Sequence, residues 1–236
     1  KLVFVSSIMW FGLTTLNAQN TYVPDDKFEQ ALIDLGYDDT LDDYVLTANI
    51  SGVTTLDVSY KEISDLTGIE AFTSLTILTC NDNQLTSLDV TANTALLELR
   101  CYTNKLTSLD VSKNTALTYL DCYGNYLTSL DVTANTALTY LDCGYNHRLL
   151  ASLDVSKNTA LIYLSCHDNK LTSLDVSANT ALIYLKCSEN QLTSLDVSNN
   201  TALVELIACC NQLTSLDVSK NTVLSELQCF TNQLTS

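Results

Sequence analysis

A block of 21 residues repeats along this chain from Leu75 to the C-terminal end. The spacing stays at 21 residues except between Leu138 and Leu161, where it is 23. The first leucine of the block recurs at Leu75, Leu96, Leu117, Leu138, Leu161, Leu182, Leu203 and Leu224. A fixed period of this length is typical of a solenoid, in which each repeat packs against its neighbours. The search for function therefore concerns a long repeated surface rather than a single pocket.

One repeat, residues 117–137, shows how a turn of this solenoid is expected to fold. Leu120 and Cys122 are two residues apart, and such alternation predicts a short strand with one buried face. Tyr119 and Asp121 then point outward. The later part of the repeat places a second apolar stripe on the opposite wall of the coil, and an Asn-Thr-Ala turn closes it. Ordering one repeat costs roughly 30 kcal/mol, so only a stacked array is expected to fold.

An asparagine recurs at one position of every repeat, and its amide can both donate and accept hydrogen bonds to the inner turn. These residues are Asn83, Asn104, Asn125, Asn146, Asn169, Asn190, Asn211 and Asn232. With the recurring words Leu-Thr-Ser-Leu-Asp-Val-Ser-x-Asn-Thr-Ala-Leu, the region from Val53 to Ser236 resembles bacterial surface leucine-rich repeat proteins similar to internalins. The resemblance implies an α/β superhelix of mostly short parallel strands and turns with little helix. It also implies gentle curvature, with partners bound on the concave strand face.

The chain divides into three expected segments. Residues 1–18 are similar to an export signal, because Lys1 precedes an apolar run and a small residue precedes Gln19. The run is shorter than the roughly 20 apolar residues of a membrane span. A buried N-terminal strand or an uncleaved anchor is the alternative. We therefore expect an exported protein, extracellular or at the cell surface, without membrane insertion. The missing initiator Met and the end at Ser236 in mid-repeat suggest a fragment.

Residues 19–52 are expected to form an N-terminal helical cap, and residues 53–236 about nine leucine-rich repeats, the last truncated. The cap helix is predicted between Pro24 and Gly36, with an apolar stripe at Phe28, Leu32 and Leu35. Its expected role is to cover the exposed end of the stack, because an open sheet edge invites aggregation.

The residues just before the strand leucines differ from repeat to repeat. They are Ile77, Glu98, Tyr119, Tyr140, Tyr163, Tyr184, Glu205 and Glu226. The four tyrosines are expected about 4.8 Å apart, the spacing of neighbouring strands, and Tyr102, Tyr123 and Tyr145 are expected near the same face. Exposed tyrosines offer large, rigid, amphipathic contact area and so favour binding. The alternative is that stacked tyrosines only stabilise the sheet through cross-strand contacts.

The next outward position runs Thr79, Arg100, Asp121, Asp142, Ser165, Lys186, Ile207 and Gln228. Asp121 and Asp142 are expected on adjacent strands, at a separation that a retaining glycosidase pair would use. The sequence predicts no cleft around them, and Arg100 can neutralise one. We therefore interpret them as part of a solvated polar patch that tunes binding, together with Glu98, Lys186 and Glu205. No catalytic motif occurs in the sequence, so neither an enzyme nor a cofactor is predicted.

An aspartate ladder is expected on the opposite wall, at Asp89, Asp110, Asp131, Asp154, Asp175, Asp196 and Asp217. Repulsion along this ladder is offset either by hydrogen bonds from each aspartate's own turn, which we favour, or by bridging cations. The acidic stretch 38–43 lacks the glycine of a calcium loop. No metal site is predicted.

Seven of the nine cysteines share one inward position: Cys80, Cys101, Cys122, Cys143, Cys166, Cys187 and Cys229. Because they lie in register on parallel strands, disulfides between them would be strained, and we expect buried free thiols. Cys209 and Cys210 are displaced from this position by Ala208 and are predicted to be exposed and reactive. The two-residue insertion around His147–Leu149 is either a projecting contact loop or a tolerated irregularity.

The net charge of −16 disfavours nucleic acid and anionic membranes as partners. Our leading hypothesis is an exported interaction or adhesion module that binds a protein or glycan on its concave, tyrosine-rich face. The main alternative is a structural spacer or adaptor within a larger surface protein. A third is binding to a regular lattice such as ice through evenly spaced threonines. The sequence makes no prediction of oligomeric state.

Overall fold

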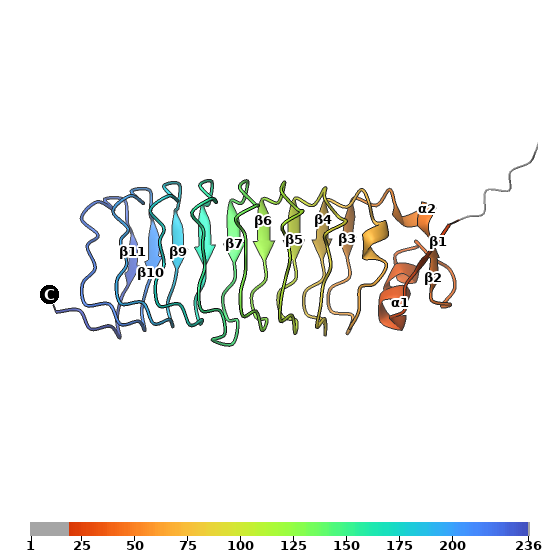
Figure 1. Cartoon of the computed structure of the whole chain (residues 1–236), viewed down its shortest axis with the longest axis horizontal. Helices are drawn as coiled ribbons and strands as arrows, with labels where there is room; N and C mark the ends of the chain where they lie inside the picture. Colours follow the sequence, from red (N-terminus) through yellow and green to blue (C-terminus); the bar gives the residue numbers. More distant parts are fainter. Residues whose placement is uncertain (1–18, 236) are drawn as a thin grey trace, which may run out of the picture.

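The computed structural model describes residues 19–235, so the predicted export signal lies outside the described residues. A row of parallel strands forms one sheet along the length of the molecule, with the strands in chain order (Figure 1). These strands are β3 Thr55–Asp57, β4 Ile77–Thr79, β5 Glu98–Arg100, β6 Tyr119–Asp121, β7 Tyr140–Asp142, β8 Tyr163–Ser165, β9 Tyr184–Lys186, β10 Glu205–Ile207 and β11 Glu226–Gln228. Each return loop runs behind the sheet to the next strand, which makes a solenoid.

The strand register places equivalent repeat positions side by side. Leu120 pairs with Leu99 on one side and Leu141 on the other, and all three are fully buried. The residues flanking each of these leucines are partly exposed on the outer face. The predicted inward and outward positions of the strands are therefore confirmed. In the final strand β11, Leu227 is 40 % exposed.

The opposite wall of the coil carries the predicted second apolar stripe, with Leu130 and Val132 buried. Asp131 accepts hydrogen bonds from the backbone N–H and the hydroxyl of Thr133, at 2.9 and 2.6 Å. These bonds hold the pKa of Asp131 below its ordinary value. Each aspartate of the ladder accepts the same backbone bond from the residue two positions later. The predicted turn role of this ladder is confirmed.

The predicted asparagine column forms hydrogen bonds between turns. The amide of Asn125 donates to the carbonyls of Cys101 and Cys122, both at 3.1 Å, and its oxygen accepts from the backbone N–H of Leu106 at 3.0 Å. Backbone groups that have no partner in a strand thus find one in the core. An unpaired buried group of this kind costs about 1–3 kcal/mol, so the column is part of the scaffold.

A second buried asparagine column, which the sequence analysis treated only as a turn, lies on the other side of the core. Asn135 donates to the carbonyls of Val111 and Asn114, both at 2.9 Å. The column consists of Asn93, Asn114, Asn135, Asn158, Asn179, Asn200 and Asn221, all buried. Both amide hydrogens are therefore used to join a turn to the one before it. Their side-chain oxygens accept no hydrogen bond within the described part of the chain.

One residue in each repeat adopts a left-handed backbone conformation, between the strand and the asparagine. The φ angles of these residues lie between 51° and 65°. They are Asp82, Thr103, Gly124, Tyr145, Asp168, Glu189, Cys210 and Thr231. This conformation costs a non-glycine residue about 1–2 kcal/mol. The hydrogen bonds of the neighbouring asparagine hold the loop in this shape.

The N-terminal part contains β1 Asn20–Tyr22 and β2 Tyr44–Leu46, which pair antiparallel, and the helices α1 Asp26–Asp34 and α2 Thr47–Ile50. The side chain of Asp25 caps α1, and Gly36, with a φ of 79°, follows its C-terminal end. Phe28 and Leu32 are buried as predicted. The prediction for Leu35 was wrong: it is 46 % exposed because the helix has already ended at this residue.

The helix α1 lies against the start of the repeat array (Figure 1). The rings of Phe28 and Phe72 are 6.4 Å apart, just after the 3₁₀ helix η1 Ile69–Ala71. The carboxylate of Asp25 also accepts hydrogen bonds from the backbone N–H and hydroxyl of Ser64, at 2.9 and 2.7 Å. These contacts place the helix where a cover for the first turn is expected.

Candidate binding face

The candidate site is the strand face, by which we mean the outward side chains of β4–β11 and the loops that follow these strands. The rings of Tyr119 and Tyr140 stack at 4.1 Å with 6° between their planes, and Tyr140 and Tyr163 stack at 4.4 Å with 4°. Tyr184 continues the row but is tilted by 45° at 6.2 Å. The register of the strands thus brings all four predicted tyrosines together. We call this row the tyrosine stack.

Each side of the tyrosine stack holds a cation that is already paired. The guanidinium of Arg100 lies 5.0 Å from the ring centre of Tyr119 and bonds to Glu98 at 2.6 Å. On the other side, the ammonium of Lys186 lies 5.7 Å from the ring of Tyr163 and 3.2 Å from Glu205. Cation–π and ion-pair contacts act together in both places.

Asp121 and Asp142 lie between these two paired cations, on the adjacent strands β6 and β7. Both side chains are partly exposed on the outer face of the sheet. Within the described residues neither forms a direct ion pair: Arg100 pairs with Glu98 instead, although its charge still acts to lower the pKa of Asp121. Burial, and then the charge of Asp142, raises the pKa of Asp121 to about 7. Burial also raises the pKa of Asp142.

Each of these carboxylates accepts a backbone hydrogen bond, and the hydroxyl of Ser165 and the charge of Lys186 also favour the charged form of Asp142. Asp121 accepts from the backbone N–H of Tyr123 at 3.2 Å, and Asp142 accepts from that of Gly144 at 2.9 Å. Both bonds reach only one oxygen, and both come from the loop that follows the same strand. This pair is therefore a local concentration of negative charge on the strand face.

Two residues beside this pair were not predicted as part of the site. The hydroxyl of Ser165 is buried and lies 2.9 Å from Nδ1 of His167. His167 occupies space left by Gly144, where an added Cβ would come within 2.6 Å of the imidazole. This arrangement could have been predicted from Gly144, because the equivalent loop position carries a side chain in the other repeats.

The loop aromatics form a second row along the edge of the strand face. The Tyr123 ring lies 5.7 Å from both Tyr145 and His167. Next to them, Tyr126 and His147 stack at 4.2 Å. Tyr123 and Tyr145, both expected near this face, thus lie side by side. Tyr102 follows β5, one turn earlier, without a ring contact to this row among residues 19–235.

The two-residue insertion is held along the array rather than projecting freely. His147 and Arg148 have φ angles of 49° and 59°. Arg148 bonds to Asp168 at 2.9 Å and to Glu189 at 3.0 Å, and so bridges two later turns. The irregularity is thus compensated by ion pairs on the surface.

The seven cysteines of the inward position are free, as predicted, and Cys209 and Cys210 are free as well. The prediction that all seven are buried was wrong for Cys229, which is partly exposed because it follows β11 at the edge of the sheet. Burial raises the pKa of Cys80 to about 12, so this thiol is inert at neutral pH. The prediction for Cys209 was wrong: it is only 8 % exposed. Cys210 and Cys229 are the partly exposed thiols. Burial, together with the carboxylate of Glu189, also raises the pKa of Cys210, which weakens it as a nucleophile.

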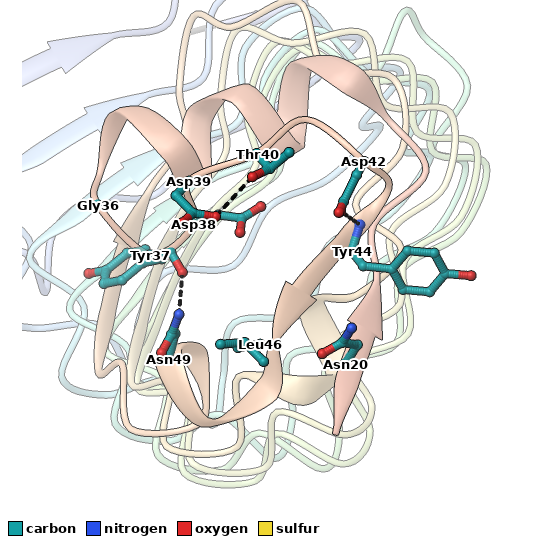
Figure 2. A pocket seen from close by; sticks show the side chains of 10 residues that line it. All are labelled: Asn20, Gly36, Tyr37, Asp38, Asp39, Thr40, Asp42, Tyr44, Leu46 and Asn49. Carbon is teal, nitrogen blue, oxygen red and sulfur yellow. Dashed lines mark hydrogen bonds between the residues drawn. The ribbon is translucent and has the colours of Figure 1, made fainter. Parts of the chain in front are cut away.

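A hollow of about 290 Å³ lies in the N-terminal part, far along the molecule from the tyrosine stack (Figure 2). Its lining is polar and acidic: Asn20, Gly36, Tyr37, Asp38, Asp39, Thr40, Asp42, Tyr44, Leu46 and Asn49. Burial raises the pKa of Asp38. In residues 19–235, no three His, Cys, Asp or Glu side chains are arranged to hold a metal ion. We therefore keep the strand face as the candidate site.

The fold and this face together define a leucine-rich repeat solenoid with short parallel strands and little helix. The chain is homologous to internalin J of Listeria monocytogenes serotype 4b (strain F2365), and it is a bacterial leucine-rich repeat protein of the internalin type. The sequence identity to internalin J is 43 % over 86 residues, which are 34 % of this chain and 9 % of that protein. No protein-family profile matches the chain.

Solved structures agree with this assignment. The functional domain of InlJ from Listeria monocytogenes, described as including a cysteine ladder, superposes with a TM-score of 0.87 and 43 % identity. The match covers 93 % of this chain and 49 % of that one, so the chain spans about half the length of this relative. The internalin InlF matches in fold with a TM-score of 0.72 at 24 % identity, over 94 % of this chain and 75 % of its own. Within the described residues, no helix has the length and apolar character needed to cross a bilayer.

Proposed function

We propose that this chain is an exported, non-enzymatic module that binds a protein partner on its strand face. The leucine-rich repeat solenoid of the internalins belongs to a protein-interaction fold family. The observation that carries the proposal is the tyrosine stack, a partly exposed aromatic surface built by four consecutive strands. Aromatic residues of this kind dominate the energetics of protein interfaces.

The ring geometry favours a protein over a glycan, although the sequence analysis left both open. A sugar ring usually packs on the face of an aromatic ring. In the tyrosine stack, the faces of Tyr140 are both covered, because its neighbours lie parallel at 4.1 and 4.4 Å. The exposed parts are ring edges and hydroxyls, which suit the mixed polar and apolar side chains of a protein.

The structural alternative is a spacer without a ligand of its own, and the same stacking favours it. Parallel aromatic neighbours stabilise a sheet by about 0.5–1.5 kcal/mol per pair. If this were their only role, replacing the tyrosines would lower stability and leave binding unchanged.

The experiment that separates these readings compares two variants of the full chain on a protein array. In the first, Tyr119, Tyr140, Tyr163 and Tyr184 are changed to serine. The matched control changes Tyr22 and Tyr44, which are exposed on β1 and β2 of the N-terminal part, outside the strand face. We expect the circular dichroism spectrum of both variants to stay close to that of the unmodified chain. We expect protein ligands to be lost only in the four-tyrosine variant. Unchanged ligand capture by that variant would refute a tyrosine-dependent binding face.

A further inference from the structure

We propose that the partner presents an arginine or lysine side chain, which the strand face takes at Asp121 and Asp142 beside the tyrosine stack. This inference rests on the proposed function and specifies the chemistry of the partner: a basic protein segment. It goes beyond a general acidic surface, because it places the cation at two named carboxylates.

The first argument is that the molecule already holds two cations in this manner. Arg100 lies between the carboxylate of Glu98 and the ring of Tyr119, at 2.6 and 5.0 Å. Lys186 lies between the carboxylate of Glu205 and a ring of the tyrosine stack, at 3.2 and 5.7 Å. A carboxylate beside a tyrosine on the strand face thus binds either kind of basic side chain.

The second argument is that the middle of the face has the same groups without a cation of its own. Tyr119 precedes Asp121 and Tyr140 precedes Asp142 on β6 and β7, so each strand carries a ring and a carboxylate. Neither aspartate belongs to an ion pair within the described part of the chain. The only remaining arginine, Arg148, is bonded to carboxylates of later turns.

The third argument concerns charge complementarity. The protein carries a net charge of −16, and two like charges one strand apart repel each other. A guanidinium or ammonium group placed between them removes that repulsion and forms charge-assisted hydrogen bonds, which are stronger than neutral ones. Tyr123 and His167 on the loop side and the tyrosine stack on the strand side supply aromatic surface for its stem.

Proton release provides an independent readout. A bound cation lowers the pKa of Asp121, so binding is expected to strengthen between pH 6 and pH 8. The titratable or charged groups around this carboxyl are Arg100 from β5, Tyr119 from β6, Tyr140 and Asp142 from β7, Tyr163 from β8, Lys186 from β9, and Tyr123 and His167 from the loops. Among these, Asp121 has a pKa of about 7.

The test uses a fluorescein-labelled peptide of alternating arginine and glycine with the full chain in about 150 mM salt, which screens long-range attraction. A citrulline version of the peptide removes the charge and keeps the shape. At pH 8, the double variant D121N/D142N is compared with D110N/D131N, which removes two carboxylates from the opposite wall. Asparagine retains an oxygen that can accept the turn hydrogen bonds in both variants.

We expect D121N/D142N to weaken peptide binding by about tenfold or more, as loss of hydrogen bonds to charged groups does. D110N/D131N is expected to change it by less than about threefold. Equal weakening in both variants would show attraction to the overall charge and overturn the proposal, as would equal binding of the citrulline peptide or no binding by the unmodified chain. If protein-array ligands are lost in the four-tyrosine variant but retained by D121N/D142N, the binding face stands and the cation assignment fails.

Discussion

Asp121 offers a test of the electrostatics of the strand face through stability alone. The pKa of its carboxyl is raised from an ordinary value of 3.8 to about 7, chiefly by burial and then by the charge of the neighbouring Asp142. A carboxyl with a raised pKa in the folded state binds more protons folded than unfolded. The folded state therefore loses stability as the pH rises from about 4 to about 7, and gains it as the pH falls through that window. The change D121N removes this penalty.

The magnitude follows from the shift. About three pKa units at 1.36 kcal/mol each correspond to about 4 kcal/mol, and since part of the carboxyl remains in water we expect about 2–4 kcal/mol. At pH 8, D121N should therefore raise the free energy of unfolding by this amount. The corresponding rise in Tm is roughly 4–16 °C for a chain of this size. At pH 4 both forms carry a neutral group here, and the difference should largely vanish.

Chemical denaturation with urea, followed by circular dichroism at pH 4, 6 and 8, measures this difference directly. The matched control is D110N. Hydrogen bonds from Ser112 lower the pKa of Asp110, so that carboxylate stabilises the fold above its unfolded pKa, and its loss should lower stability at pH 8. If D121N proves neutral or destabilising at pH 8, the carboxyl is not the uncompensated charge that we describe.

Three further predictions concern the scaffold. Changing the fully buried Leu141 to Asp should unfold much of the array, because it buries an unpaired charge. The same change at Leu227, which is 40 % exposed, should have little effect. Equal thermal melting curves for the two variants would contradict the strand register. Thr103 has a left-handed backbone with a φ of 53°, which asparagine tolerates better than threonine does. Changing Thr103 to Asn should therefore raise the free energy of unfolding, measured in urea titrations, by about 1 kcal/mol. Ser188, one position earlier in the same loop of a later turn, is the control, and a gain from Ser188→Asn of equal size would refute that cause. Finally, a thiol reagent at pH 8 should label at most the two partly exposed cysteines slowly, and the other seven only after denaturation; rapid labelling of more thiols would show that the cysteine column is open to solvent.

Much of the fold followed from the period of the sequence. The alternation around Leu120 predicted the strands, and the repeat length predicted that Tyr119 and Tyr140 would be neighbours, because parallel strands in register bring equivalent positions together. Side-chain partners within one turn were also accessible, as the aspartate ladder shows. These interactions depend only on sequence separation, which the repeat makes uniform.

Interactions that depend on how a side chain bends across turns were harder to predict. Arg100 reaches Glu98 rather than Asp121, although both are near it in the sheet, because the rotamer decides between them. Cys209 was expected outside the core, yet the loop after β10 turns it inward. His167 entered the site only because Gly144 leaves room on the preceding turn. None of these choices is set by the repeat itself.

The two asparagine columns also have a mechanical consequence. Their hydrogen bonds join each turn to the one before it, so the contacts between successive turns are nearly identical along the array. At the insertion this regularity breaks: Asn146 donates only to carbonyls of its own turn, and the oxygen of Asn169 has no partner among the described residues. The bonds of Arg148 to Asp168 and Glu189 span the joint between the β7 and β8 turns from outside. The pairing of β7 with β8 and the bonds of Asn158 and Asn169 still join these turns, so the ion pairs of Arg148 add to a joint that lacks one asparagine bond. Salt screens such ion pairs, so in single-molecule force measurements the rupture force of this joint should fall slightly as salt is added. Rupture at a salt-independent force would contradict this.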